Sequence, residues 1–201
     1  MNFKQPQIIL ASGSSQRSAL LKMCYIPHRV IISRIKEKTA VKGNPAELVI
    51  RNAYNKANSV AYKLKTGLVI GADSIAYAGN RVIGKLKTGT PLIKILKFIS
   101  GRVSFIYTGL ALIDVKNQRC VMGYARTAVK MKRPSEPELI RWAKVLGFRS
   151  DCAGGFSIDG PGAVLIPHIE GCYFNILGMP ISKLAELFNG LGYNMLDFIK
   201  K

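Results

Sequence analysis

The stretch IILASGSSQRSALLKM, residues 8–23, changes from apolar to small and hydroxylated and then becomes amphipathic. Its first four residues are apolar and partly β-branched, a pattern typical of a strand buried on both faces. Ser14 or Ser15 can cap a following helix whose apolar side includes Leu20 and Leu21. Free N–H groups and a partial positive charge at a helix N-terminus attract phosphate. The stretch therefore predicts a strand–turn–helix unit whose turn can bind an anion.

Arg17 lies in the first turn of this predicted helix, where its charge opposes the helix dipole. An arginine at such a position is explained in two ways. It is an anion ligand, or it is the solvated side chain of an ordinary strand–turn–helix unit. The residues of this stretch alone leave both interpretations open.

The composition indicates a folded globular protein. The chain has 201 residues, of which 48% are hydrophobic, enough for one substantial core or one domain with two lobes. No apolar run approaches the roughly 18–20 residues of a membrane span, and MNFKQPQ does not resemble a signal peptide, so we expect a cytoplasmic protein without a membrane span. Four cysteines without a CxxC pair, and two histidines, disfavour a zinc site.

The charge is strongly positive, with 30 Lys and Arg against 11 Asp and Glu, giving +19. Such a balance is typical of proteins with a polyanionic partner, either nucleic acid or a phosphorylated small molecule. The cations are dispersed and no basic strand is interleaved with aromatic residues, which disfavours nucleic acid. A lysine-rich compositional drift without functional meaning explains the excess equally well.

Strands and helices alternate along the chain, which predicts an α/β protein with a mixed sheet. After the opening unit we expect a strand over 28–33 and a long helix over 45–66. Two hairpins follow, over 68–85 with a Gly79-Asn80 turn and over 103–132, with a helix over 91–100 between them. Ser135 and Glu138 predict a capping box for a helix reaching residue 146. The last elements are a strand over 162–171 and helices over 180–187 and 195–200.

Asp73 ends the apolar run LVIGAD, which predicts a carboxylate at the end of a buried strand. Such a carboxylate is costly unless it is hydrogen-bonded, metal-bound or catalytic, and strand ends are where α/β sheets bind ligands. The alternative is that Asp73 caps the following turn. Lys85, at the end of the return strand, is expected near the same rim.

Lys56 lies on the long helix beside the small residues Ala53 and Ala57, so it either snorkels to solvent or points into a cleft. Together with Arg17 and Lys85 it would place three cations around Asp73, a set that suits a triphosphate and a divalent metal. Glu37 stands among basic residues. It is either a second carboxylate directed at the metal or half of a solvated ion pair.

Five blocks, in order from residue 9 to about residue 187, resemble motifs of the Maf nucleoside triphosphate pyrophosphatases. LASGSSQR resembles LAS-x-S-P-R-R, GADS resembles G-A-D-T, and GK at residues 84–85 resembles E/G-K-P. ISGRVSFIYTGLAL resembles S-G-x-x-H-x-V-Y-T-G-V. CAGGFSIDGPGAVLIPHIEGCYFNILGMPI resembles A-G-A-Y-x-I-Q-G-x-G-x-x-F-V-x-x-I-x-G-x-Y-x-N-V-x-G-L-P-L.

The resemblance implies one domain over residues 1–201, with an elongated mixed sheet flanked by helices and two lobes around a central cleft. It implies hydrolysis of a nucleoside triphosphate to monophosphate and pyrophosphate with Mg²⁺ or Mn²⁺. By position, the resemblance implies that Asp73 is the family's proton acceptor. It also implies that Glu37 and Asp73 are the acidic residues that bind the metal. The phosphate-binding positions correspond to Ser12, Arg17, Lys56 and Lys85. A homodimer is left open.

The sequence departs from the family motifs at Gln16, Ser74, Asp159 and at Leu86, which follows the lysine. These differences concern selection of the base more than phosphate chemistry. Gln16 replaces the arginine of the dTTP/UTP branch and the tryptophan of the 7-methyl-GTP branch. CAGGF and FIYTGLAL look more like the latter, and an ionised Asp159 would accept from the donors of guanine. We therefore expect 7-methyl-GTP as substrate, although Asp159 is equally explained as a turn residue. The alternatives are a dTTP/UTP pyrophosphatase and a basic regulator of cell division.

Overall fold

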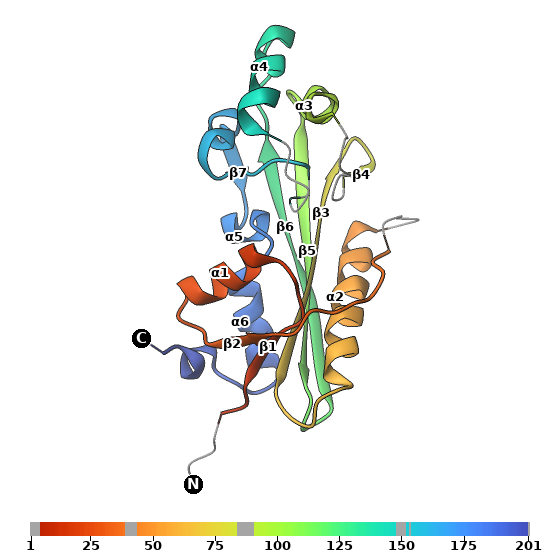
Figure 1. The fold of residues 1–201 in the computed structure, drawn as a ribbon, viewed down its shortest axis with the longest axis vertical. Coiled ribbons are helices and arrows are strands. Elements are labelled where there is room, and N and C mark those ends of the chain that lie inside the picture. Colours follow the sequence, from red (N-terminus) through yellow and green to blue (C-terminus); the bar gives the residue numbers. More distant parts are fainter. Residues whose placement is uncertain (1–4, 39–43, 84–90, 148–151, 153, 201) are drawn as a thin grey trace.

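A computed structural model describes residues 5–38, 44–83, 91–147, 152 and 154–200. Three long strands run along the elongated molecule (Figure 1): β3 (Leu68–Ala78), β5 (Val103–Asp114) and β6 (Arg119–Lys130). Four short strands complete the sheet: β1 (Ile8–Leu10), β2 (His28–Val30), β4 (Arg81–Ile83) and β7 (His168–Glu170).

The sheet has the order β2-β1-β3-β5-β6-β7, with β4 paired to β3. Strand β1 runs parallel to both β2 and β3, whereas all other pairs are antiparallel. The expected mixed α/β sheet is confirmed. In the described part of the chain no helix is long and apolar enough to cross a membrane.

One edge of β3 is shared by two short strands. Strand β1 pairs with Leu68–Ile70, and β4 pairs with Ala76–Ala78. Among the described residues no strand pairs with 71–75 on this edge, although β5 pairs with the same residues on the other side. Asp73 lies in this interval. It is therefore in the middle of β3, and the expectation that it ends the strand is wrong, because β3 stays paired with β5 as far as Tyr77 and with β4 as far as Ala78.

Helices cover both faces of the sheet and divide the core into two lobes (Figure 1). In the first lobe, α2 (Pro45–Ala61) packs on one face of β3 and β5, and α1 (Ser15–Met23) with α6 (Ile181–Gly190) covers the other. In the second lobe, α3 (Leu92–Ile99) and α4 (Glu136–Leu146) pack at the far end of the long strands.

Helix α2 touches the backbone of the sheet at two glycines. A Cβ atom on Gly71 of β3 would lie 2.0 Å from the carbonyl oxygen of Ala53, and one on Gly109 of β5 would lie 2.3 Å from that of Val49. Ala57, small as the sequence suggested, is also at this contact. Two glycines on the sheet and two alanines on the helix thus permit backbone-to-backbone packing.

Several local predictions are confirmed by the structure. Ser14 caps α1, with its Oγ accepting from the backbone N–H of Arg17, and the capping box of Ser135 and Glu138 opens α4. Gly79 and Asn80 connect β3 to β4 with φ of 51° and 61°, as a two-residue hairpin turn requires.

Other local predictions are wrong. Helix α2 ends at Ala61 rather than near residue 66. The strand expected over 162–171 begins inside the 3₁₀ helix η1 (Gly160–Leu165), and only its later part forms a strand, β7. Pro161 in the first turn of η1 has no N–H to pair in a sheet, and Gly162 packs on the carbonyl of Ser157, where a Cβ would be 2.1 Å from the oxygen. The helix α5 (Tyr173–Ile176) was not expected. The last predicted helix is a single 3₁₀ turn, η2 (Met195–Phe198).

The glycine contact can be tested by adding one methyl group. Gly71→Ala is expected to lower the free energy of unfolding by about 3 kcal/mol, because the new Cβ meets helix backbone that cannot move aside without shifting α2. Gly123→Ala in β6 is the matched control, since its Cβ would meet side-chain atoms at an ordinary 3.5 Å. Urea denaturation of both variants measures the difference. Equal stabilities of the two variants would show that the packing of α2 on β3 does not require glycine at position 71.

Candidate active site

Arg17 connects α1 to two other parts of the chain. The residue is only 7% exposed, which excludes the solvated alternative. Nη1 donates to Ser12 Oγ at 3.2 Å and to the Ala72 carbonyl at 2.9 Å, Nε donates to the Gly178 carbonyl at 2.9 Å, and Nη2 donates to Ser74 Oγ at 3.0 Å. Four of its five N–H groups are used in these bonds. Arg17 thus fixes the turn after β1, the open edge of β3 and the loop between α5 and α6 together.

Burial lowers the pKa of the Arg17 guanidinium, and the negative charges of Asp73 and Glu37 oppose that shift. Since a guanidinium starts from a very high pKa, it keeps its proton at physiological pH. Arg17 therefore contributes a permanent positive charge at a fixed place.

Asp73 is held by two side chains from α2. Lys56 Nζ donates to Oδ1 at 2.7 Å, and Asn52 Nδ2 donates to Oδ2 at 2.8 Å. All three residues are buried, with exposures of 5% or less. The turn-cap interpretation of Asp73 is thereby excluded. Because each carboxylate oxygen has two acceptor positions, each can still accept one further hydrogen bond.

Lys56 is shared by two carboxylates. Besides Asp73, its ammonium contacts Glu37 Oε1 at 2.8 Å and donates to the Ala72 carbonyl at 3.1 Å. Its side chain is buried, so it does not snorkel to solvent, whereas that of Glu37 is 36% exposed. Glu37 thus forms an ion pair at the border of the site.

Asn52 is a site residue that the sequence analysis missed. Its Nδ2 also donates to the Lys38 carbonyl at 2.8 Å, and its Oδ1 accepts from the Lys38 N–H at 3.1 Å. It therefore holds the segment that carries Glu37 as well as the Asp73 carboxylate. The available signal was its spacing: Asn52 and Lys56 are four residues apart and so lie on one face of α2.

The Ala72 carbonyl links groups from the two faces of the sheet, because its oxygen accepts from both Arg17 and Lys56. Successive side chains of a strand point to opposite faces, so Asp73 faces α2 while Ser74 faces α1. A ligand at the open edge of β3 can contact groups from both faces.

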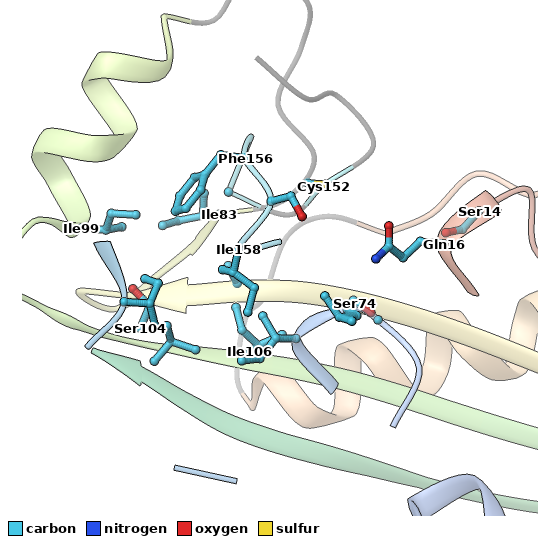
Figure 2. A pocket seen from close by; sticks show the side chains of 18 of the residues that line it. Ser14, Gln16, Ser74, Ile83, Ile99, Ser104, Ile106, Cys152, Phe156 and Ile158 are labelled. Atoms are coloured by element: carbon cyan, nitrogen blue, oxygen red, sulfur yellow. The ribbon is translucent and has the colours of Figure 1, made fainter. Parts of the chain in front are cut away.

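A pocket of about 120 Å³ begins at this edge, on the face opposite α2. Figure 2 shows Ser14 and Gln16 toward one end, Ser74 with Ile106 and Ile158 between, and Ile83, Ile99 and Phe156 at the other. The first end is polar and also includes Arg17 and Asp73. The second is apolar and is completed by side chains that include Val129, Met131 and Ile166.

The residues predicted to select the base are placed differently from one another. Gln16 and Ser74 line the pocket, but Asp159 is exposed and does not. Instead Asp159 accepts from Gln16 Nε2 at 3.2 Å and from the Tyr173 hydroxyl. The hydrogen bond to Asp159, partial burial and the charge of Asp159 raise the pKa of Tyr173. Lys85, the remaining predicted cation, and Leu86 lie outside the described residues.

The donor set is compatible with a divalent cation. Among the described residues there is no group of three or more His, Cys, Asp and Glu side chains that could enclose a metal. Asp73 and Glu37 nevertheless converge on a single cation, the Lys56 ammonium. Mg²⁺ is commonly held by one or two carboxylates, with water and substrate phosphates as its other ligands. Two carboxylates, of which Asp73 lines the pocket, fit that mode of binding.

Fold and site together define a two-lobed α/β protein with a buried carboxylate and fixed cations at the open edge of its sheet. The model of the Maf-like protein family matches residues 7–191, and the chain belongs to this family. It is 35% identical to a dTTP/UTP pyrophosphatase of Dictyoglomus thermophilum, over 94% of this chain and 98% of that one. It is 38% identical to a nucleoside triphosphate pyrophosphatase of Synechococcus sp., over 96% and 98%.

The resemblance to the Maf family is thereby confirmed, but the expected preference for 7-methyl-GTP is not supported. A third relative, from Acetivibrio thermocellus, is 36% identical over 96% of this chain and 99% of its own, and is again named a dTTP/UTP pyrophosphatase. Among solved structures, that of the Staphylococcus aureus Ham1 protein matches 62% of this chain and 71% of its own, with a TM-score of 0.43 and 15% identity. A likeness at that level carries no conclusion.

The shared lysine gives a stability prediction. Lys56→Met is expected to lower the free energy of unfolding by about 3 kcal/mol or more, because it leaves the buried Asp73 carboxylate without its counter-charge. Lys97→Met is the control: Lys97 pairs with Glu136 at the surface, and such pairs contribute less than about 1 kcal/mol. Thermal and urea unfolding measure both. A Lys56 variant as stable as the Lys97 variant would refute the shared-cation arrangement.

Proposed function

We propose that this protein is a nucleoside triphosphate pyrophosphatase that hydrolyses dTTP or UTP to the monophosphate and pyrophosphate, with a divalent cation. The main support is the Asp73 carboxylate, held at the open edge of β3 by Lys56 and Asn52 beside the fixed charge of Arg17. The names of the relatives at 35–38% identity agree with this reaction.

In the proposed reaction Asp73 accepts a proton from water. The water oxygen forms a bond to the α-phosphorus, the bond between that phosphorus and the oxygen bridging it to the β-phosphorus breaks, and pyrophosphate leaves with the electron pair. Lys56 and Asn52 each occupy one acceptor position on Asp73, which fixes the carboxylate plane and leaves further positions for the water. Orientation of the base by neighbouring side chains is what general-base catalysis requires.

Charge stabilisation comes from groups already held in place. Arg17 lies beside the N-terminus of α1, and together with Ser12 it presents a positive, hydrogen-bonding surface to a leaving phosphate group. With most of its donors bound to the protein, Arg17 acts as a positioned charge more than as a flexible ligand. Asp73 and Glu37 would hold the divalent cation, which when bound neutralises phosphate charge.

The apolar end of the pocket is proposed to take the nucleobase, with Ser74 between this end and Gln16. Asp159 would then influence base selection indirectly. By accepting from Gln16 Nε2 it orients the carboxamide, so that Gln16 Oε1 remains available to accept a hydrogen bond from the bound nucleotide. Lys85 remains a proposed phosphate ligand on the resemblance alone.

A panel of nucleotides tests the reaction and the substrate class. Pyrophosphate release from dTTP, UTP, CTP, ATP and 7-methyl-GTP is measured with Mg²⁺ and with Mn²⁺. We expect dTTP and UTP to have the highest kcat/KM and all release to stop when the metal is chelated. Absence of pyrophosphate from every nucleotide would refute the proposed activity, and faster cleavage of 7-methyl-GTP would refute the substrate class alone.

Asp73→Asn tests the proton acceptor. The substitution keeps the shape of the side chain but removes a base, so kcat for dTTP or UTP is expected to fall by about 10²-fold or more with KM changed much less. Asp197→Asn, at an exposed position in η2, should leave kcat unchanged. If the Asp73→Asn variant kept more than about a tenth of the wild-type rate, Asp73 would be excluded as the base.

A further inference from the structure

Ser104 is a buried hydroxyl inside the pocket that the proposed reaction does not use. It lies near the start of β5, opposite Val129 of β6, and its side chain is on the same face of the sheet as Ile106. The residue is 8% exposed, and its Oγ has no hydrogen-bond partner among the described residues. Figure 2 shows it near Ile99, at the end of the pocket away from Ser14 and Gln16.

An unpartnered buried hydroxyl lowers the stability of the protein that contains it. Native structures contain few such groups, and one that lines a pocket is explained when its partner arrives with a ligand. The side chains close to Ser104 are apolar, as Val129, Ile106 and Ile99 illustrate, so they offer it neither a donor nor an acceptor.

Other hydroxyls of the same pocket are already bonded within the protein. Ser74 Oγ accepts from Arg17 and shares a hydrogen bond with Thr108 Oγ1 at 2.9 Å. Ser157 Oγ accepts from the backbone N–H of Asp159 at 3.3 Å. Ser104 differs from both, because its hydrogen-bonding capacity is intact.

We propose that Ser104 Oγ binds the nucleobase, donating its hydroxyl proton to a ring carbonyl oxygen of uracil or thymine. This assignment rests on the proposed function, which puts the phosphates at the polar end of the pocket near Arg17. The base then extends toward the apolar end, where the flat ring contacts isoleucine side chains and one ring carbonyl would otherwise be buried without a donor. Ser104 is thus a specificity residue, distant from the reacting phosphorus.

Binding of products, which needs no turnover, tests the proposal. Ser104→Ala is expected to weaken binding of UMP and dTMP by about three- to tenfold, the usual effect of one neutral hydrogen bond, as measured by calorimetry. Binding of inorganic pyrophosphate should not change, since it has no base. The melting temperature of the free protein should stay equal or rise, because the substitution removes an unsatisfied group. In turnover, KM for dTTP and UTP should rise with little change in kcat.

Two further variants distinguish the effect of the Ser104 hydrogen bond on UMP binding from the effect of burying apolar surface. Ser104→Val makes the position larger and more apolar, so tighter or unchanged UMP binding would show that burial, not a hydrogen bond, governs the site, and would overturn the proposal. Ser59→Ala removes a hydroxyl that is already bonded to the Lys56 carbonyl outside the pocket, and should leave UMP binding unchanged.

The proposal also fails if Ser104→Ala binds UMP as the wild type does, or if UMP and pyrophosphate binding fall equally. Failure of the proposed activity gives a different result. Pyrophosphate release would then be absent from the wild type for every nucleotide, whatever residue stands at position 104.

Discussion

The contact between the backbone of α2 and the backbones of β3 and β5 is the constraint on which the site depends. At Gly71 and Gly109 no side chain holds the helix away from the sheet. A side chain at either position would meet the backbone of α2 and push the helix outward, and with it Lys56 and Asn52, away from the Asp73 carboxylate. Close packing instead puts both donors within 2.8 Å of it. The geometry of the charged groups is thus a consequence of residues that carry no functional group.

Close packing also buries the charges, and buried charges are tolerated only as a complete set. The Lys56 ammonium balances the charges of Asp73 and Glu37. Arg17 lies on the other face of β3 and, like Lys56, donates to the Ala72 carbonyl. A hydrogen-bonded path continues from Arg17 through Ser74 and Thr108 to the backbone of α5. Removing one member takes a partner from its neighbours, so the site forms as a unit.

Much of the fold could be predicted because its signals are local. The Ser14 cap, the Gly79-Asn80 turn and the capping box at Ser135 each depend on a few adjacent residues. The grouping of Arg17, Lys56 and Asp73 was also predicted, since charges in apolar segments seldom stand alone. The predictions that failed depend on residues far away in the sequence. Strand β3 continues beyond Asp73 because β5 pairs with it. Asp159 holds Gln16 instead of lining the pocket because of its place before η1 and its contact with α5. Asn52 looked like any polar helix residue until the strand beneath it was known.

The long strands have a mechanical consequence. Strands β3 and β5 are paired from Leu68–Asp114 to Tyr77–Phe105, and β5 and β6 along their whole length, so both lobes are built on the same continuous ladders. Swinging one lobe away from the other would shear these hydrogen bonds, unlike the flexing of a hinge at a few loop residues. The sheet therefore fixes the distance between the polar end of the pocket and its apolar end before any ligand binds. Ligands whose charged and apolar ends are separated by that distance bind without any rearrangement of the protein.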